Sequence, residues 1–588
     1  MKPHIYLAAG ALCTTLLESL SPSLVPSIAL SLIPGLILSL ALPPCDARAA
    51  EGKILPSVLS RTQYESLARP AEVPADADLE AAGARIGTVH IDAQNIFDTS
   101  KPQENTALFR LADALHIRTR VATVQDQLLF HTGERYDGRL LEESERILRG
   151  TRYLQEANIR PVAYHDGVVD IEVVTHDVWT LNPGISFGRK GGKNTSGLEI
   201  EDLNLLGFGS QVSLGRKSGV DRTSTTLLYH DAQLGSSWWT VTAGYSDNSD
   251  GRTEQLDLER PFYALDTRWS AGVSALRDDR VDSLYDLGNI TDQFGTQVRL
   301  ATVYGGWSPG LHEGWTQRVR VGVTYDETKF TPVIGETGPT TLLPANRKLV
   351  YPWVGYEWVQ DDFEKTRNRD QIEKTEDFLL GVHATAQLGF ASTSFGSDRN
   401  AFVFSGTLSR AYEPSERSRL LLSSSVTGRD ESGTFADVVG GIAARYYLRE
   451  SDRRLLFLAT LADVASNLDL DHQLLLGGDN GLRGYPLRYQ GGDGRWLFTI
   501  EQRFFSNWYP FRLFNVGGAI FYDMGRTWGD NPAGSRSLGM LRDVGFGLRL
   551  GNSRSALGNV LHVDLAFPLD GDKSISKVQF LVETQRSF

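Results

Sequence analysis

The residue types that most often carry catalysis are not arranged for it in this sequence. The 11 histidines are scattered, without H-E-x-x-H or a comparable ligand spacing, and this pattern predicts no metal centre. Both cysteines, Cys13 and Cys45, lie in the first 50 residues, which we interpret below as an export signal. The mature chain would then have no thiol for a disulfide, a metal site or a nucleophile. We therefore expect no metal and no cofactor.

Two stretches match the letters of a G-x-S-x-G nucleophile elbow, Gly184–Gly188 and Gly306–Gly310. The elbow requires a strand before the serine and a helix after it, and neither stretch has that context. Gly545-Phe546-Gly547 followed by Gly551 has the wrong last spacing for a dinucleotide loop. We expect the chain not to be an enzyme, although a Ser-His-Asp site with distant members stays open.

The most informative stretch runs from Gly477 to Tyr485 and ends in Leu482-Arg483-Gly484-Tyr485. Arginine cannot lose its proton, so a position of Arg483 inside a barrel requires carboxylate partners with good geometry. Gly484 would let the chain turn tightly, and Tyr485 would pack at the tip of the loop. The alternative is an ordinary Arg-Gly turn on the surface.

Glu501 and Asp523 are the candidate partners of Arg483. Glu501 alternates with Phe498 and Ile500 and can therefore face a lumen. Asp523 shares its face with Phe521, which would then have to bury its ring against the loop instead of in lipid.

The elements that position these residues are expected to be strands. A length of 588 residues favours two or more folded units. Abundant glycine (58), 10% aromatic residues and only 3 methionines suit strands and turns better than a helical bundle. The net charge of −13 comes from interspersed acids and bases, so we expect no nucleic-acid partner.

Residues 1–49 are interpreted as a signal peptide. Lys2 opens an apolar stretch, and a second apolar run, 24–42, precedes an A-x-A-like cleavage signal at 47–49. The true start codon stays open. Alternatives are a retained anchor, which Pro26 and Pro34 would interrupt, and lipidation at Cys45, where Pro44 stands in place of the small residue expected there. No later stretch is apolar enough for a membrane helix, which leaves a β-barrel as the way to cross a bilayer.

Residues 50–84 are predicted to be a linker, and residues 85–178 a small α+β domain. A strand pattern at 86–91 is followed by helical spacing at Leu108, Leu111 and Leu115. Asp137 can cap an amphipathic helix, and Asp166-Gly167 suits a tight hairpin between 159–164 and 168–174.

From 179 to 588 the dominant pattern is period-2 alternation. Val319, Val321 and Val323 lie on one face, and the polar residues between them lie on the other. Alternation alone fits both a soluble sandwich and a membrane barrel. Aromatic residues expected in interfacial girdles favour the barrel; they are Trp307, Trp353, Trp358, Trp508, Tyr509 and Trp528. At about 25 residues per strand with its loop, the segment predicts about 16 antiparallel strands. The polar stretches 326–348 and 361–376 are expected to be long outside loops.

The Leu482-Arg483-Gly484-Tyr485 tetrad resembles the V/I/L-R-G-F/Y motif of the superfamily that includes BamA, TamA and the two-partner-secretion transporters. The stretches 498–504, 521–525, 545–549 and 564–568 resemble the closing strands of that superfamily. Gly133–Asp137 and Ser144–Arg149 resemble a conserved stretch of its periplasmic POTRA domains. Residues 578–583 and the terminal Phe588 resemble the signal by which barrels reach the assembly machinery.

The resemblance implies a transmembrane barrel in the bacterial outer membrane, preceded by a POTRA-like domain in the periplasm. It implies a loop carrying Arg483 that folds back into the lumen. The expected partners are outer-membrane lipid and a polypeptide client, which the protein would insert into or move across the membrane. The resemblance implies no nucleotide and no metal. A single POTRA-like domain departs from the several or two that are usual in the superfamily.

Two alternatives come from other functional classes, a passive channel or receptor and a barrel enzyme such as a lipase or protease. The identity of the client, the choice between insertion and secretion, and the need for further subunits stay open.

Overall fold

A computed structural model describes residues 68–372, 374–531, 534, 537–552, 554–555 and 560–585. The predicted signal peptide, most of the predicted linker and Phe588 lie outside the described residues. Within the described ranges, no helix combines the length and the apolar character that crossing a bilayer requires.

The N-terminal part is a small α+β domain. Its elements are α3 (Asp76–Ala81), β1 (Arg85–Gln94), α4 (Ala107–Leu115), α5 (Val121–Gln125), α6 (Gly138–Gly150), β2 (Leu154–His165) and β3 (Val168–Asp177). The sheet has the order β1-β3-β2, with β1 parallel and β2 antiparallel to the central strand β3. The predicted order of strand, helices and hairpin is confirmed.

Local sequence signals explain the ends of these elements. The Asp137 side chain accepts a hydrogen bond from the backbone N–H of Arg139 and so caps α6. Asp166 and Gly167 have φ values of 50° and 78°, as a tight hairpin between β2 and β3 requires. Leu148 of α6 packs with Ile171 and other side chains of the sheet in the domain core.

The predicted linker extends too far. Val73 is 5% exposed and Leu79, on α3, is fully buried in the same core as Leu148. The surrounding alanines and acids suggest a solvated segment, but these two apolar side chains are enough to dock α3 on the domain. The domain therefore begins before residue 85.

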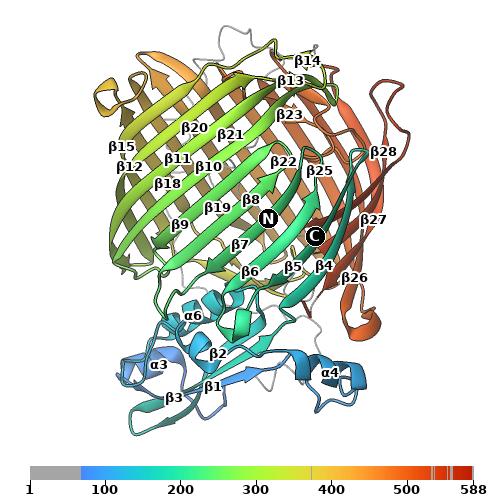
Figure 1. The fold of residues 1–588 in the computed structure, drawn as a ribbon. Helices are drawn as coiled ribbons and strands as arrows, with labels where there is room; N and C mark the ends of the chain where they lie inside the picture. The colour runs from blue at the N-terminus through green and yellow to red at the C-terminus, as the bar shows by residue number, and fades with distance from the viewer. Residues whose placement is uncertain are drawn as a thin grey trace.

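The rest of the chain forms a closed antiparallel barrel (Figure 1). Its first ten strands are β4 (Leu181–Lys190), β5 (Lys193–Asp202), β6 (Gln211–Ser218), β7 (Thr223–Asp231), β8 (Thr240–Asn248), β9 (Gly251–Arg260), β10 (Trp269–Asp286), β11 (Asn289–His312), β12 (Trp315–Pro332) and β15 (Arg347–Gln360). The other ten are β18 (His383–Ala391), β19 (Ala401–Ser415), β20 (Ser418–Glu431), β21 (Thr434–Ser451), β22 (Arg454–Ser466), β25 (Gly494–Phe505), β26 (Phe514–Trp528), β27 (Leu541–Asn552), β28 (Val560–Pro568) and β29 (Gln579–Gln585).

The barrel has 20 strands, so the predicted count of about 16 is wrong. The prediction assumed about 25 residues for each strand with its loop. Several connections are much shorter than that allows: only two residues separate β4 from β5 and β10 from β11.

The wall has an apolar outer face. Val319, Val321 and Val323 are 37%, 57% and 45% exposed and point outward, as the alternation predicts. Trp307 and Trp358 are also exposed on this face, whereas Trp353 points inward and donates from Nε1 to Thr324 Oγ1. A large exposed apolar surface on a closed wall is suited to lipid rather than to water.

The two ends of the barrel differ. We call the end next to the small domain the domain end and the opposite one the far end (Figure 1). β4 starts at the domain end, and the strands then alternate in direction, so β15 ends there. The stretch 361–376 follows β15 and therefore lies at the domain end. The stretch 326–348 spans the connection between β12 and β15 at the far end. The prediction that both stretches are outside loops is therefore wrong, because length and polarity do not distinguish the two ends.

The seam between β29 and β4 is the least paired joint of the wall. Among the described residues, Val582 opposite Arg189 is the only registered pair between them. The neighbouring joint of β28 with β29 is registered from Val560 opposite Gln585 to Ala566 opposite Gln579. An ion pair of 2.9 Å between Lys190 Nζ and Glu583 Oε1 adds to the seam.

Candidate functional site

The candidate site is a loop at the far end, between β22 and β25, that folds into the lumen. Two short strands, β23 (Leu474–Leu476) and β24 (Gln490–Gly492), pair at its base. Leu482 and Tyr485 are fully buried, although they lie in a connection between strands. The motif is therefore a packed internal element, and the alternative of a surface Arg-Gly turn does not fit this geometry.

Arg483 contacts both carboxylates that the sequence suggested. Its Nε and Nη2 donate to the two oxygens of Asp523 over 2.7 and 3.0 Å, which is a bidentate pair. Its Nη1 donates to Glu501 Oε2 over 2.7 Å. The side chains of Glu501 and Asp523 are 5% and 0% exposed, so both charges depend on arginine for compensation.

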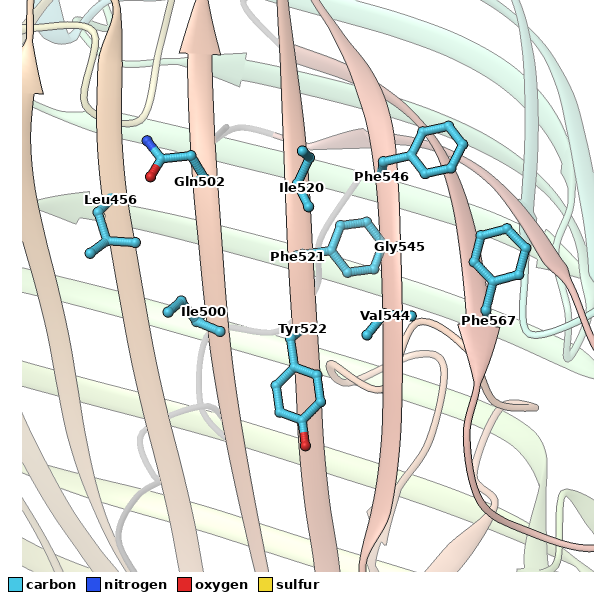
Figure 2. A pocket seen from close by; sticks show the side chains of 10 residues that line it. All are labelled: Leu456, Ile500, Gln502, Ile520, Phe521, Tyr522, Val544, Gly545, Phe546 and Phe567. Carbon is cyan, nitrogen blue, oxygen red and sulfur yellow. The ribbon is translucent and has the colours of Figure 1, made fainter.

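Phe521 shares the inward face with Asp523, and its ring is buried against the loop. The ring centroid lies 3.4 Å from Cζ of Arg483, a cation–π geometry. Figure 2 shows the ring next to Gly545 on the neighbouring strand, where a side chain would collide with it. On the outer face behind Phe521 lies an apolar hollow of about 550 Å³, whose lining includes Ile500, Ile520 and Val544.

Gly484 and Tyr485 fix the loop to the wall. A Cβ on Gly484 would lie 2.6 Å from Cβ of Asp543, so glycine is needed here for close approach. The predicted tight turn at Gly484 is present, because the Tyr485 N–H donates to the Leu482 carbonyl over 3.0 Å, but the φ of Gly484 is not in the left-handed region that would itself require glycine. The Tyr485 hydroxyl donates to the Arg542 carbonyl over 2.7 Å and accepts from the Arg542 N–H over 3.0 Å. Tyr485 lies in the distal part of the loop, between its base strands β23 and β24, and packs inside the lumen.

Sequence reasoning missed part of the charge network. Arg503 Nε donates to Glu501 Oε1 over 3.0 Å, and Arg549 Nη2 lies 3.5 Å from Glu501 Oε2. Arg549 also pairs with Asp564. The alternation of side chains could have predicted both arginines. Arg503 lies two residues after Glu501 and therefore on the same face of its strand, and Arg549 lies an even number of residues after the inward-facing Gly545.

Asp543 is a further buried acid beside the loop. It stands opposite Asp523 in the register of β26 and β27. Both of its carboxyl oxygens are buried, beside the backbone of Gly484 and the carboxyl group of Asp523. The immediate surroundings of Arg483 therefore contain more acids than Arg483 itself pairs with.

The loop touches both sides of the seam. On one side Tyr485 is bonded to Arg542 at the start of β27 and to the Asp570 carbonyl after β28. On the other side the backbone N of Leu487 approaches Gly191 so closely that a Cβ there would lie 2.5 Å away. Gly191 is in the turn between β4 and β5. The loop thus bridges the weakest joint of the wall at the far end.

A second element occupies the lumen from the domain end. Residues 361–382, of which 373 is not described, form a hairpin of β16 (Phe363–Arg367) and β17 (Thr375–Leu379). We call it the lumen hairpin. Ile372, beyond the end of β16, is 4% exposed and packs among inward side chains that include Tyr447, Leu455 and Phe505. The hairpin reaches the inner face of strands β21 to β28.

The lumen hairpin is bound at both of its ends. At the small domain, Arg149 of α6 forms a bidentate pair with Asp377, with distances of 2.6 and 2.8 Å. Lys365 Nζ donates to Glu145 Oε1 over 2.7 Å. Inside the lumen, Arg503 Nη1 donates to the Arg369 carbonyl over 2.7 Å. Arg503 therefore contacts both the hairpin and Glu501.

Within the part of the chain that the structure describes, one group of side chains could offer ligands to a metal: Asp437, Asp469 and His472, at the far end. Arg429 lies 2.7 Å from Asp469 and 3.7 Å from Asp437, so its charge already compensates the acids. Burial lowers the pKa of His472, but the hydrogen bond to Asp437 and the negative charges of Asp437 and Asp471 together raise this pKa, which favours the protonated ring over a metal ligand. The two G-x-S-x-G stretches lie within β4 and β11 and have no helix after them.

Fold and site together define a closed β-barrel that has an apolar outer face, a lumen-folded arginine loop and a small α+β domain at one end. No protein-family model and no curated protein matches the chain. The structure is similar to BamA from Haemophilus ducreyi lacking POTRA domains 1–3, with 14% identity, 85% of this chain and 84% of that chain covered, and a TM-score of 0.37. It is also similar to CdiB from Acinetobacter baumannii, with 12% identity, 85% of this chain and 74% of that chain covered, and a TM-score of 0.42. CdiB from Escherichia coli is similar as well, with 13% identity, 97% of this chain and 100% of that chain covered, and a TM-score of 0.43.

Proposed function

We propose that the protein inserts polypeptides into the bacterial outer membrane or moves them across it. In this proposal the small domain is a POTRA-like module in the periplasm, and the chain belongs with the BamA, TamA and two-partner-secretion transporters. The observation that carries the proposal is the Arg483 loop, which is held in the lumen by Glu501 and Asp523 and bridges the seam. A barrel that only encloses water has no need of such a loop.

The seam is the proposed exit for the client. Every other joint of a closed barrel must be broken over many backbone hydrogen bonds, whereas β29 and β4 share one registered pair among the described residues. A client strand could pair with the freed edges, which would replace the lost hydrogen bonds. The loop would keep the two sides aligned while the seam is closed.

The small domain would present the client. Its sheet has two edge strands, β1 and β2, and an extended segment can add to such an edge through its backbone.

The lumen hairpin and the Arg483 loop also argue against the passive channel, because both occupy the lumen. We propose no catalytic activity, no cofactor and no nucleotide, and turnover by the purified protein would contradict that part.

A cross-link across the seam tests the proposal. The variant with Arg189→Cys and Val582→Cys joins the one registered pair and should block client handling under oxidising conditions, with recovery after reduction. A matched pair, Ser196→Cys with Ser218→Cys, joins β5 to β6 and should leave function unchanged. The readout is a survey of outer-membrane and secreted proteins after depletion of the wild type and expression of each variant. Full function with the seam cross-linked would contradict exit through the seam.

A second outcome separates the passive channel from the proposed function. If depletion leaves the outer-membrane and secreted proteins unchanged while the purified barrel shows a steady, large conductance in planar bilayers, the passive channel is the correct class.

A further inference from the structure

The exposed apolar side chains of the small domain gather in one short segment. Among the described residues from 68 to 178, all the large apolar side chains that are exposed lie between 108 and 121. They are Leu108 (66% exposed), Leu111 (56%), Leu115 (66%), Ile117 (51%) and Val121 (50%). A concentration of this kind on an otherwise ordinary domain surface marks a contact with another apolar body.

The segment is held so that these side chains cannot turn inward. Phe109 of α4 stacks on Phe97 at a centroid distance of 4.1 Å and is buried in a cluster that includes Trp179. After the helix, His116 Nε2 is bonded to the buried Asp177 over 2.9 Å. Leu108, Leu111 and Leu115, spaced i, i+3 and i+7, form a separate stripe along α4.

The segment lies along the rim of the barrel beneath the seam. At one end, α4 packs near Leu513, in the turn between β25 and β26, and near Trp179, two residues before the start of β4. At the other end, Arg120 Nε donates to the Leu206 carbonyl and Thr123 Oγ1 to the Gly207 carbonyl, both in the turn between β5 and β6. Figure 1 shows α4 beside the foot of β26.

The turns on either side carry exposed apolar side chains as well. Phe511 and Trp508 are 81% and 66% exposed in the turn before β26, and Leu206 and Phe208 are 50% and 51% exposed in the turn before β6. Above these turns the outer wall begins, where Ile185 of β4 is 85% exposed. The apolar segment is therefore continuous with the lipid-facing surface of the barrel.

The charges of the segment suit an anionic surface. Residues 105–125 contain Arg110, Arg118 and Arg120 and a single acid, Asp113, although the whole chain has a net charge of −13. Asp113 also accepts a hydrogen bond from the backbone N–H of Phe97. An apolar stripe with arginines beside it is the pattern of helices that lie in a membrane interface.

We propose that residues 107–121, the membrane-contact segment, bind the phospholipid leaflet next to the domain end. Leu108, Leu111 and Leu115 enter the boundary between headgroups and acyl chains, and the arginines contact lipid phosphates. The contact holds the small domain against the membrane directly beneath the seam. This inference needs the barrel to be in a bilayer but is independent of whether the barrel handles polypeptides.

Nitroxide spin labels test the proposal in the full-length protein, reconstituted in phospholipid nanodiscs with and without an anionic phospholipid. The label is attached at Leu111→Cys or Leu115→Cys, and at Asp78→Cys, an exposed polar position of α3 in the same domain, as the control. We expect labels at 111 and 115 to collide more often with oxygen than with a water-soluble nickel complex. The control label at 78 should collide more often with the nickel complex than with oxygen. The anionic phospholipid should move the labels at 111 and 115 deeper into the membrane.

The opposite result overturns the proposal. If labels at 111 and 115 are as accessible to the nickel complex as the label at 78, the segment faces water. If they become protected from nickel only after an apolar client peptide is added, the surface binds polypeptide and not lipid. Folding of each variant is checked by the heat-dependent gel mobility of the barrel, which does not depend on the labelled positions.

Discussion

The guanidinium of Arg483 lies over the ring of Phe521, with Cζ 3.4 Å from the ring centroid. This contact explains how the aromatic ring of Phe521 is accommodated on the inward face of β26. Arg483 contributes the cation, Phe521 excludes water from one side of it, and Asp523, two residues along the same strand face, completes the pairing. The charged and the aromatic inward positions of β26 thus serve one loop.

Replacement of Arg483 is expected to abolish function while the barrel still forms. In Arg483→Ala, the buried Glu501 and Asp523 lose their shared cation, and loss of one partner of a buried pair costs about 3–5 kcal/mol. We expect this free-energy cost to destabilise the docked position of the loop and not the barrel wall, because the wall is held by its backbone hydrogen bonds. The measurement compares client levels in cells with the heat-dependent gel mobility of the variant.

Arg488→Ala is the matched control for that change, since Arg488 lies in the same loop and pairs with Asp221, whose side chain is 44% exposed. An exposed pair contributes about 0–1 kcal/mol, so this variant should keep its function. Normal client levels in Arg483→Ala at wild-type protein abundance would contradict the role of the loop.

A methyl group at Gly484 is expected to displace the motif. The new Cβ would lie 2.6 Å from Cβ of Asp543, and overpacking of this kind costs about 1–3 kcal/mol. Gly484→Ala should therefore lower activity in the same assay and increase proteolysis within the loop. Gly305→Ala, where no atom lies within 4 Å of the added carbon, should change neither, and equal behaviour of the two variants would show that the close approach is unimportant.

Removal of the lumen hairpin is expected to open the barrel to ions. Replacement of residues 363–379 by two glycines deletes β16, β17 and the buried Ile372, so the lumen at the domain end loses its occupant. Single-channel recordings in planar bilayers should show larger and longer openings than the wild type. Deletion of the short far-end hairpin formed by β13 (Ile334–Gly335) and β14 (Gly338–Pro339) is the control. A conductance as low as that of the wild type after removal of the lumen hairpin would contradict the prediction that this hairpin blocks the lumen.

The hairpin should loosen as the pH rises. Burial, aided by the negative charge of Asp370, raises the pKa of Glu376 to about 7 from an ordinary value of 4.5. Between these values the docked hairpin holds a proton that the undocked one releases, so docking is strongest below about pH 4.5 and weakens as the pH rises through about 7. Channel openings in bilayers should become more frequent over this range, and Glu376→Gln, which cannot titrate, should abolish the change.

Alternation of side chains predicted much of the wall and of the site. The outward face of Val319, Val321 and Val323 follows from period-2 spacing. The inward position of Glu501 follows from the same rule, because Phe498 and Ile500 alternate with it. The hairpin at Asp166-Gly167 and the cap at Asp137 are local signals, and the structure has both.

Alternation and local motifs could not predict features that depend on contacts between residues far apart in the sequence. The strand count needed the lengths of the turns, and spacing does not reveal where a strand of up to 24 residues, such as β11, ends. The position of 361–382 inside the lumen depends on Ile372 meeting Tyr447 and Phe505, contacts that no local pattern encodes. The weakness of the joint between β29 and β4 is a matter of register between the two ends of the barrel sequence.

Arg503 has a consequence for communication along the molecule. Its guanidinium holds the backbone of the lumen hairpin on one side and Glu501 on the other. The hairpin is in turn attached to helix α6 through Arg149 and Asp377. A tilt of the small domain would therefore pull, through a single arginine, on the acid that keeps Arg483 in place, and an event in one compartment could be sensed at the opposite face of the membrane without any chemical messenger.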